Sequence, residues 1–168
     1  MAEKEAVIKE KVEEAGIFDF AGLYGFAYSW LVSQEDYGLV EEKYSEKVSA
    51  AERDLEIEWK ASKKLSDYFK IELGMKYNVS KMSEVEVEID GVKKKMNKGR
   101  VIIELKGTLI RDPESKWDAN PLYKFFREVY DKYVVPQRVD ASRDKVMSDV
   151  ITLKDSIKAF LDLSGKRR

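Results

Sequence analysis

The chain contains no cysteine and no histidine among its 168 residues. Without cysteine it cannot form a disulfide, a thiolate metal site or a cysteine nucleophile. Without histidine it cannot form a Ser-His-Asp triad, use a histidine general base or offer an imidazole ligand to a metal. An enzyme built from this sequence would depend on carboxylates, lysine, tyrosine or serine alone. We therefore expect a protein that is not an enzyme and that carries neither a cofactor nor a metal.

Proline is scarce, and no charge of one sign dominates. The three prolines, Pro113, Pro121 and Pro136, all lie in the last third of the chain, so the region before them is free of the residue most hostile to sheets. Charged residues reach 38%, but 31 basic residues nearly cancel 32 acidic ones. A nucleic-acid-binding surface would need a basic excess, so we expect no nucleic-acid partner.

Long hydrophobic runs are also missing. The most apolar stretch, residues 16–32, contains Asp19 and spaced glycines, and it is too short and too polar to cross a bilayer. The first ten residues carry glutamate and lysine from the third position and have no apolar signal segment. We expect a cytoplasmic protein with no membrane span. No linker or internal repeat interrupts the chain, which predicts a single domain over residues 1–168.

Near its N-terminus the chain is expected to form a strand and then a helix. Residues 6–14 are expected to form the first strand, and Asp19 is suited to cap a helix over residues 18–34. Asn120 followed by Pro121 is typical of the start of another helix. A long final helix is predicted over residues 139–163. Its apolar seam is formed by Val146, Val150, Leu153, Ile157 and Phe160.

Between these helices, the apolar residues alternate with polar ones. From residue 39 to residue 111 the period is two, as in half-buried antiparallel strands. Asp90-Gly91 is a strong hairpin signal, because a tight type I′ turn needs positive φ angles. Asn97-Lys98-Gly99 is interpreted as a second turn. The predicted fold is α+β: a curved antiparallel sheet of six to seven strands, with one N-terminal helix and a long C-terminal helix packed on it.

This order of elements resembles that of the helix-grip superfamily, which includes the START and Bet v 1-like proteins. The resemblance implies a sheet wrapped around the C-terminal helix, often with an apolar ligand between them. The segments VEEKYSEKV, EVEVEIDGVKKKMNKG and ESKWDANPLYKFFREVYDKY resemble an uncharacterised family of small archaeal proteins from small-genome, symbiosis-prone lineages. That second resemblance implies no activity.

Three glutamates fall in phase with apolar residues. Glu10 lies between Ile8 and Val12, and Glu42 and Glu46 interleave with other apolar positions. If the first two strands are neighbours, these carboxylates share one inward face and could bind a cation or act as an acid/base pair. Alternatively, both strands lie at sheet edges, where inward charge discourages edge pairing, or a bulge turns the side chains outward.

The aromatic residues form the second candidate set. They outnumber what a small core needs, so some are expected to line an apolar pocket or an interface between subunits. The positions that we expect to serve in this way are Trp117, Tyr123, Tyr130 and Tyr133.

Two functional hypotheses follow from these observations. The first is a structural or assembly protein that forms a homo-oligomer or polymer, alone or with a paralogous subunit, through strand edges and aromatic patches. The second is a helix-grip carrier that holds a hydrophobic small molecule in a cavity between the sheet and the C-terminal helix.

Overall fold

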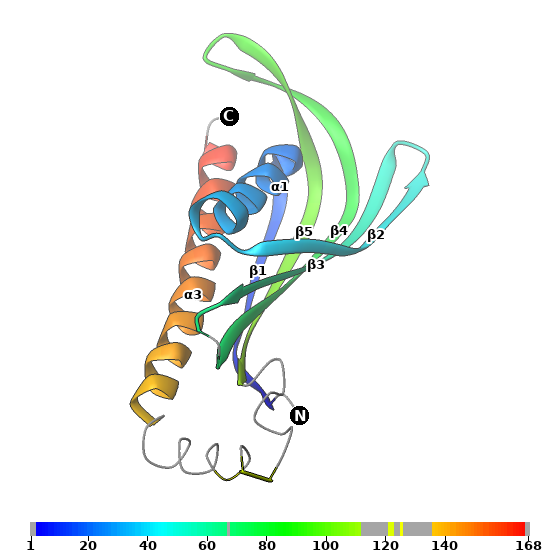
Figure 1. Cartoon of the computed structure of the whole chain (residues 1–168). Helices are drawn as coiled ribbons and strands as arrows, with labels where there is room; N and C mark the ends of the chain where they lie inside the picture. The colour runs from blue at the N-terminus through cyan, green and yellow to red at the C-terminus, as the bar shows by residue number, and fades with distance from the viewer. Residues whose placement is uncertain (1–2, 67, 112–120, 123–124, 126–135, 167–168) are drawn as a thin grey trace.

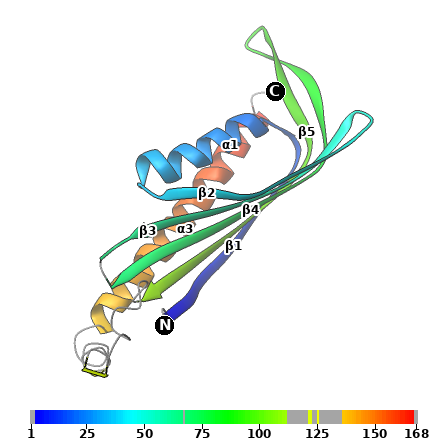
Figure 2. The ribbon, with the colours of Figure 1, turned by 45° about the vertical axis from the view of Figure 1, so that its right-hand side comes forward.

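The computed structural model describes residues 3–66, 68–111, 121–122, 125 and 136–166. They form an antiparallel sheet with two helices on one of its faces (Figures 1 and 2). The strand order is β1-β5-β4-β3-β2, so β1 and β2 are the two edges. The strands are β1 (Glu3–Phe18), β2 (Gly38–Ser49), β3 (Glu52–Lys64), β4 (Phe69–Ile89) and β5 (Val92–Arg111).

The described part of the chain has five strands, so the prediction of six to seven was wrong. The difference arises because β4 and β5, with 21 and 20 residues, are three to four times as long as an ordinary strand of about 5–6 residues, so each spans a region predicted as two strands. The hairpin at Asp90-Gly91 is confirmed, with φ angles of 51° and 79°. The turn predicted at residues 97–99 does not exist, because β5 runs straight through it. A β-carbon on Gly99 would lie 2.8 Å from the carbonyl oxygen of Ser80, at a register shift in β4.

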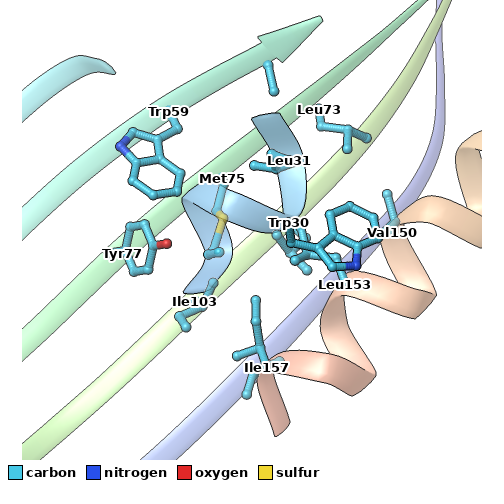
Figure 3. Close-up of a cluster of buried hydrophobic side chains, with 14 of the residues drawn as sticks. Trp30, Leu31, Trp59, Leu73, Met75, Tyr77, Ile103, Val150, Leu153 and Ile157 are labelled. Carbon is cyan, nitrogen blue, oxygen red and sulfur yellow. The ribbon is translucent and has the colours of Figure 1, made fainter. Parts of the chain in front are cut away.

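Alternation divides each strand between two faces. We call the face that carries the helices the inner face and the opposite one the outer face. In β4 the inner positions are almost fully buried, while the residues between them are partly exposed. Figure 3 shows several of the inner residues packed beneath the helices. The buried inner residues in this alternation of β4 are Phe69, Ile71, Leu73, Met75, Tyr77 and Val79.

Helix α1 (Phe20–Ser29) begins where the sequence predicts it. The side chain of Asp19 accepts a hydrogen bond from the backbone N–H of Gly22 at 3.0 Å, which satisfies one of the free donors of the first turn. A π-helical turn, η1 (Trp30–Gln34), continues α1 towards β2. The prediction of one helix over residues 18–34 is thus confirmed in extent. α1 lies over the middle strands, since Tyr24 packs edge-on against Trp59 at a centroid distance of 4.8 Å.

Helix α3 (Pro136–Lys166) is the long C-terminal helix, and it lies against β1 and β5. Four residues of the predicted seam, Val146, Val150, Leu153 and Ile157, are fully buried. The fifth inner position belongs to Leu161, whereas Phe160 turns towards α1 and stacks on Phe26 at 5.3 Å. α3 thus covers one edge of the inner face and α1 covers the centre (Figure 1).

The approach of α3 to the sheet is closest at Gly107 of β5. A β-carbon at this position would lie 2.5 Å from Cγ1 of Val146 and 2.9 Å from Cγ2 of Val150. Side chains of α3 therefore occupy the space that any other residue at position 107 would need.

The helix predicted from Asn120 onward lies mostly outside the described residues. Pro121, Leu122 and Phe125 are helical, but Leu122 and Phe125 are exposed by 60% and 57%, so these two do not join the described core as the predicted apolar stripe would require. No helix in the described ranges is long and apolar enough to cross a membrane.

Candidate functional site

The structure does not bring the three predicted glutamates together. Glu10 lies on β1, and Glu42 and Glu46 lie on β2 at the opposite edge of the sheet, with three strands between them. The hypothesis that the first two strands are neighbours was therefore wrong. The alternative that both strands are sheet edges is confirmed.

Each of these glutamates has its own surroundings. Glu10 faces α3 and forms an ion pair with Lys154 at 3.0 Å, both side chains being partly buried. Glu46 pairs with Arg53 of the neighbouring strand at 3.4 Å. Glu42 lies at a register shift, since Glu41 and Lys43 occupy successive positions opposite β3. This shift is the predicted bulge, and it takes Glu42 out of the alternation. These positions belong to separate ion pairs and a bulge, not to one acid/base site.

The predicted aromatic positions, Trp117, Tyr123, Tyr130 and Tyr133, lie outside the described residues. The described aromatic residues gather instead beneath and beside α1. Trp59 packs edge-on against Tyr77 at 5.0 Å and against Tyr28 at 6.3 Å. These rings fill the inner face over β3 and β4 (Figure 3).

One carboxylate lies at the border of this aromatic cluster. Glu41 accepts hydrogen bonds from the hydroxyl of Tyr24 at 2.8 Å and from Nε1 of Trp59 at 3.2 Å. Burial, and then the Glu41 carboxylate, raises the pKa of Tyr24 above its ordinary value. The hydroxyl of Tyr77 is buried nearby and has no hydrogen-bond partner in the described part of the chain. Glu41 thus fastens the edge strand β2 to α1 and β3.

A second polar cluster joins α3 to the segment between η1 and β2. Asp149 is 4% exposed and accepts a hydrogen bond of 2.6 Å from the hydroxyl of Tyr37. It also pairs with Lys145 at 2.9 Å, and Lys145 reaches Glu35 at 3.5 Å. Burial, followed by the bond to Asp149, raises the pKa of Tyr37, and the same carboxylate raises the pKa of Lys145. This buried acid is fully partnered, which suits a structural role.

The outer face carries an open depression of about 790 Å³. Charged residues of both signs contribute to its lining, although the carboxylate of Glu10 itself faces α3 on the other side of the sheet. Alternation places Lys76, Glu58 and Glu104 on this face, and Gly74 leaves space between them. The lining charged residues are Lys9, Lys11, Lys76, Lys106, Glu10, Glu42, Glu58 and Glu104.

The edge strand β2 carries apolar side chains in the open. Val40, Tyr44 and Val48 are exposed by 61%, 55% and 67%. In the register with β3, Tyr44 and Val48 point to the inner face, beyond the part that α1 covers, whereas Val40 points outward. An edge strand presents unpaired N–H and C=O groups to any partner strand, and exposed apolar residues favour such pairing.

Several of these features escaped the sequence analysis. Asp149 falls in the apolar phase of α3, between Val146 and Val150, which was a signal of a buried carboxylate. Glu41 gave no such signal, because its position depends on the bulge beside it. Within the described residues, no three Asp or Glu side chains are arranged to hold a metal ion. Comparisons with protein-family models, curated proteins and solved structures give no match, so the two resemblances noted in the sequence stay predictions.

Proposed function

We propose that this protein is a non-enzymatic structural or assembly protein that associates with copies of itself, or with a related subunit, through free strand edges. The observation that carries the proposal is β2. It is an edge strand of 12 residues with three large apolar side chains exposed. Natural sheets protect such an edge by shortening it, covering it, or adding charges and bulges. β2 has charges and a bulge at Glu42, but it is neither short nor paired on its outer side in the described part of the chain. Pairing with a strand of another copy would satisfy its backbone groups and bury Tyr44 and Val48.

The surroundings of the carboxylates support a role without catalysis. General acid/base chemistry needs a carboxyl group that is free to exchange a proton with a substrate. Glu10 is paired with Lys154, and Asp149 is held by both Tyr37 and Lys145. Glu41 accepts two hydrogen bonds. Each of these groups serves to fix one element against another.

The carrier hypothesis has less support. A ligand between the sheet and α3 would need space along the seam of α3, where Val146, Val150, Leu153 and Ile157 are each at most 1% exposed. At Gly107 the helix approaches so closely that a single methyl group would not fit. The depression of about 790 Å³ lies on the other face and is lined by charges, unlike an apolar carrier cavity.

Light scattering across protein concentration tests the proposal. We expect the average mass to rise with concentration, and we expect the double substitution Tyr44→Lys/Val48→Lys to weaken the association. The control substitution Ile151→Lys/Leu163→Lys replaces two exposed apolar residues of α3 in the same way and should leave the mass unchanged. A wild-type protein that stays monomeric at the highest attainable concentration would refute self-association and restore the carrier hypothesis.

A further inference from the structure

The end of the β4–β5 hairpin extends beyond the rest of the sheet. β3 pairs with β4 only as far as Met82, and β1 pairs with β5 only from Asn97 onward. In the described part of the chain, residues 83–89 of β4 pair with no strand other than β5, and residues 92–96 of β5 pair with no strand other than β4. We call this two-stranded segment the ribbon. Figures 1 and 2 show it reaching past both helices.

The ribbon is left with two free edges. A two-stranded hairpin in water is marginally stable by itself, and it gains stability when further strands or a packed face are added. Some of its apolar surface remains open, because Val92 is 66% exposed and Val85 is only partly buried, whereas Met96 is buried against the body. The ribbon therefore has both backbone groups and apolar surface to offer to a neighbour.

The two strands of the ribbon carry opposite charges. The β4 strand has glutamates at 84, 86 and 88, and the β5 strand has lysines at 93, 94 and 95, all exposed. In the register, Glu86 lies opposite Lys95 and Glu88 lies opposite Lys93, so these four side chains share one face. The ribbon thus has an acidic edge and a basic edge, and its charges lie on one face except for that of Lys94, which is opposite Val87 on the other face.

From these observations we propose that the acidic β4 edge of the ribbon in one copy pairs with the basic β5 edge of the ribbon in the next copy. The inference rests on the self-association proposed above and adds to the β2 edge a second, separate contact between copies. Contacts between two acidic edges or two basic edges would place like charges opposite each other, which disfavours a symmetric ribbon dimer. In a contact between unlike edges, each of Lys93 and Lys95 lies between a glutamate of its own copy and a glutamate of the neighbouring copy.

The direction of the strands is compatible with this contact. β4 and β5 are antiparallel, so a copy placed side by side with the first presents its β4 edge antiparallel to the neighbouring β5 edge. The charged face of one ribbon then continues into the charged face of the next, and the apolar face continues into the next apolar face. Such a contact is heterologous, since one copy uses its β4 edge and the other its β5 edge, and it continues until a ring closes or a filament forms.

The width of the molecule requires a rotation between neighbouring copies. Two strands occupy roughly 10 Å across, whereas a five-stranded sheet spans roughly 24 Å. Neighbouring bodies must therefore diverge if their ribbons are to touch. The contacts form a ring if this rotation closes and a helical filament if it does not. In a ring, the ribbons would form a closed antiparallel barrel, which leaves no free ribbon edge.

Charge reversal tests the proposal in the full chain. One variant makes both edges basic and a second makes both acidic; they are E84K/E86K/E88K and K93E/K94E/K95E. We expect each variant alone to need at least roughly tenfold more protein for half-association than the wild type, measured by sedimentation velocity at low salt. An equimolar mixture should restore assembly with the two variants in equal numbers. The control D144K/D155K/D162K changes the net charge by as much as E84K/E86K/E88K, but at exposed positions of α3, and it should assemble like the wild type.

The outcomes separate this inference from the proposed function. If wild type and both variants assemble equally, the ribbon contact is wrong, while self-association through another edge such as β2 stands. If each variant loses assembly but the mixture does not regain it, the ribbon contact is also refuted, because complementary edges should pair whichever copy supplies them. A wild type that is always monomeric overturns both proposals. A mixed assembly of alternating variants supports both.

Discussion

Replacing Gly107 by alanine measures how tightly α3 packs on the sheet. Two effects of opposite sign compete. Alanine restricts the unfolded chain, which stabilises a protein by about 0.4–1 kcal/mol where the backbone tolerates it. Gly107 is not among the glycines with positive φ, so its backbone conformation is one that alanine can also adopt. The added methyl group, however, would lie 2.5 Å from Val146 and 2.9 Å from Val150.

The packing effect should win. Forcing one extra methyl group into a closely packed core typically costs about 1–3 kcal/mol. Subtracting the entropic gain leaves a net loss between about 0 and 2.6 kcal/mol, which for a domain of this size lowers the melting temperature by up to about 10 °C. The variant Gly107→Ala/Val146→Ala removes the nearest obstructing atom. It should therefore be more stable than the sum of the two single effects, by at least about 0.5 kcal/mol.

Urea unfolding followed by circular dichroism provides the assay. Gly74→Ala is the matched control, because it lies on the outer face of the same sheet and the nearest heavy atom to its added carbon is 4.0 Å away. That control should be neutral or slightly stabilising. If Gly107→Ala is as stable as the control, then α3 does not lie where the structure places it.

Three further predictions concern single groups. Tyr77→Phe should be neutral or stabilising, because it removes a buried hydroxyl without a described partner; a loss above about 1 kcal/mol in urea unfolding would reveal a hidden partner. Stability should fall as the pH rises above about 10, because Tyr37 and Tyr77 keep their protons in the folded state but lose them when unfolded; an equally steep loss in the variant Tyr37→Phe/Tyr77→Phe, measured by urea unfolding at each pH, would contradict this. Asp19→Ala should cost about 1 kcal/mol through the lost cap of α1, and unchanged thermal unfolding would argue against the cap.

Local signals in the sequence predicted the local structure well. Asp19 marked the start of α1, Asp90-Gly91 marked a real hairpin, and four of the five seam residues of α3 are buried. Each of these depends on neighbours a few residues away, which a periodic pattern records directly. The one failed turn shows the limit of such signals. Gly99 is present because the backbone of Ser80 on the neighbouring strand comes too close for a side chain. In the sequence, a glycine placed for this reason cannot be told from a glycine that forms a turn.

The candidate site could not be predicted in the same way. The phase of Glu10 was read correctly, since its side chain faces α3 and meets Lys154. Its grouping with Glu42 depended on strand order, and alternation says nothing about which strands are neighbours. The acidic and basic halves of the ribbon are visible in the sequence as EVEVEI and VKKK. Their meaning emerges only when the register shows that no described strand covers them.

The position of β1 beside β5 has a consequence for how the chain folds. β2, β3, β4 and β5 follow one another in a meander, so each can pair with a strand made just before it. β1 cannot pair until β5 has been synthesised, because β5 is its partner, with Val12 opposite Ile103, and β5 is the last of the described strands in the chain. Closing so long a loop is slow compared with forming hairpins. β1, although it precedes the other four described strands in the chain, is thus among the last to join the sheet, and α3 then packs against it.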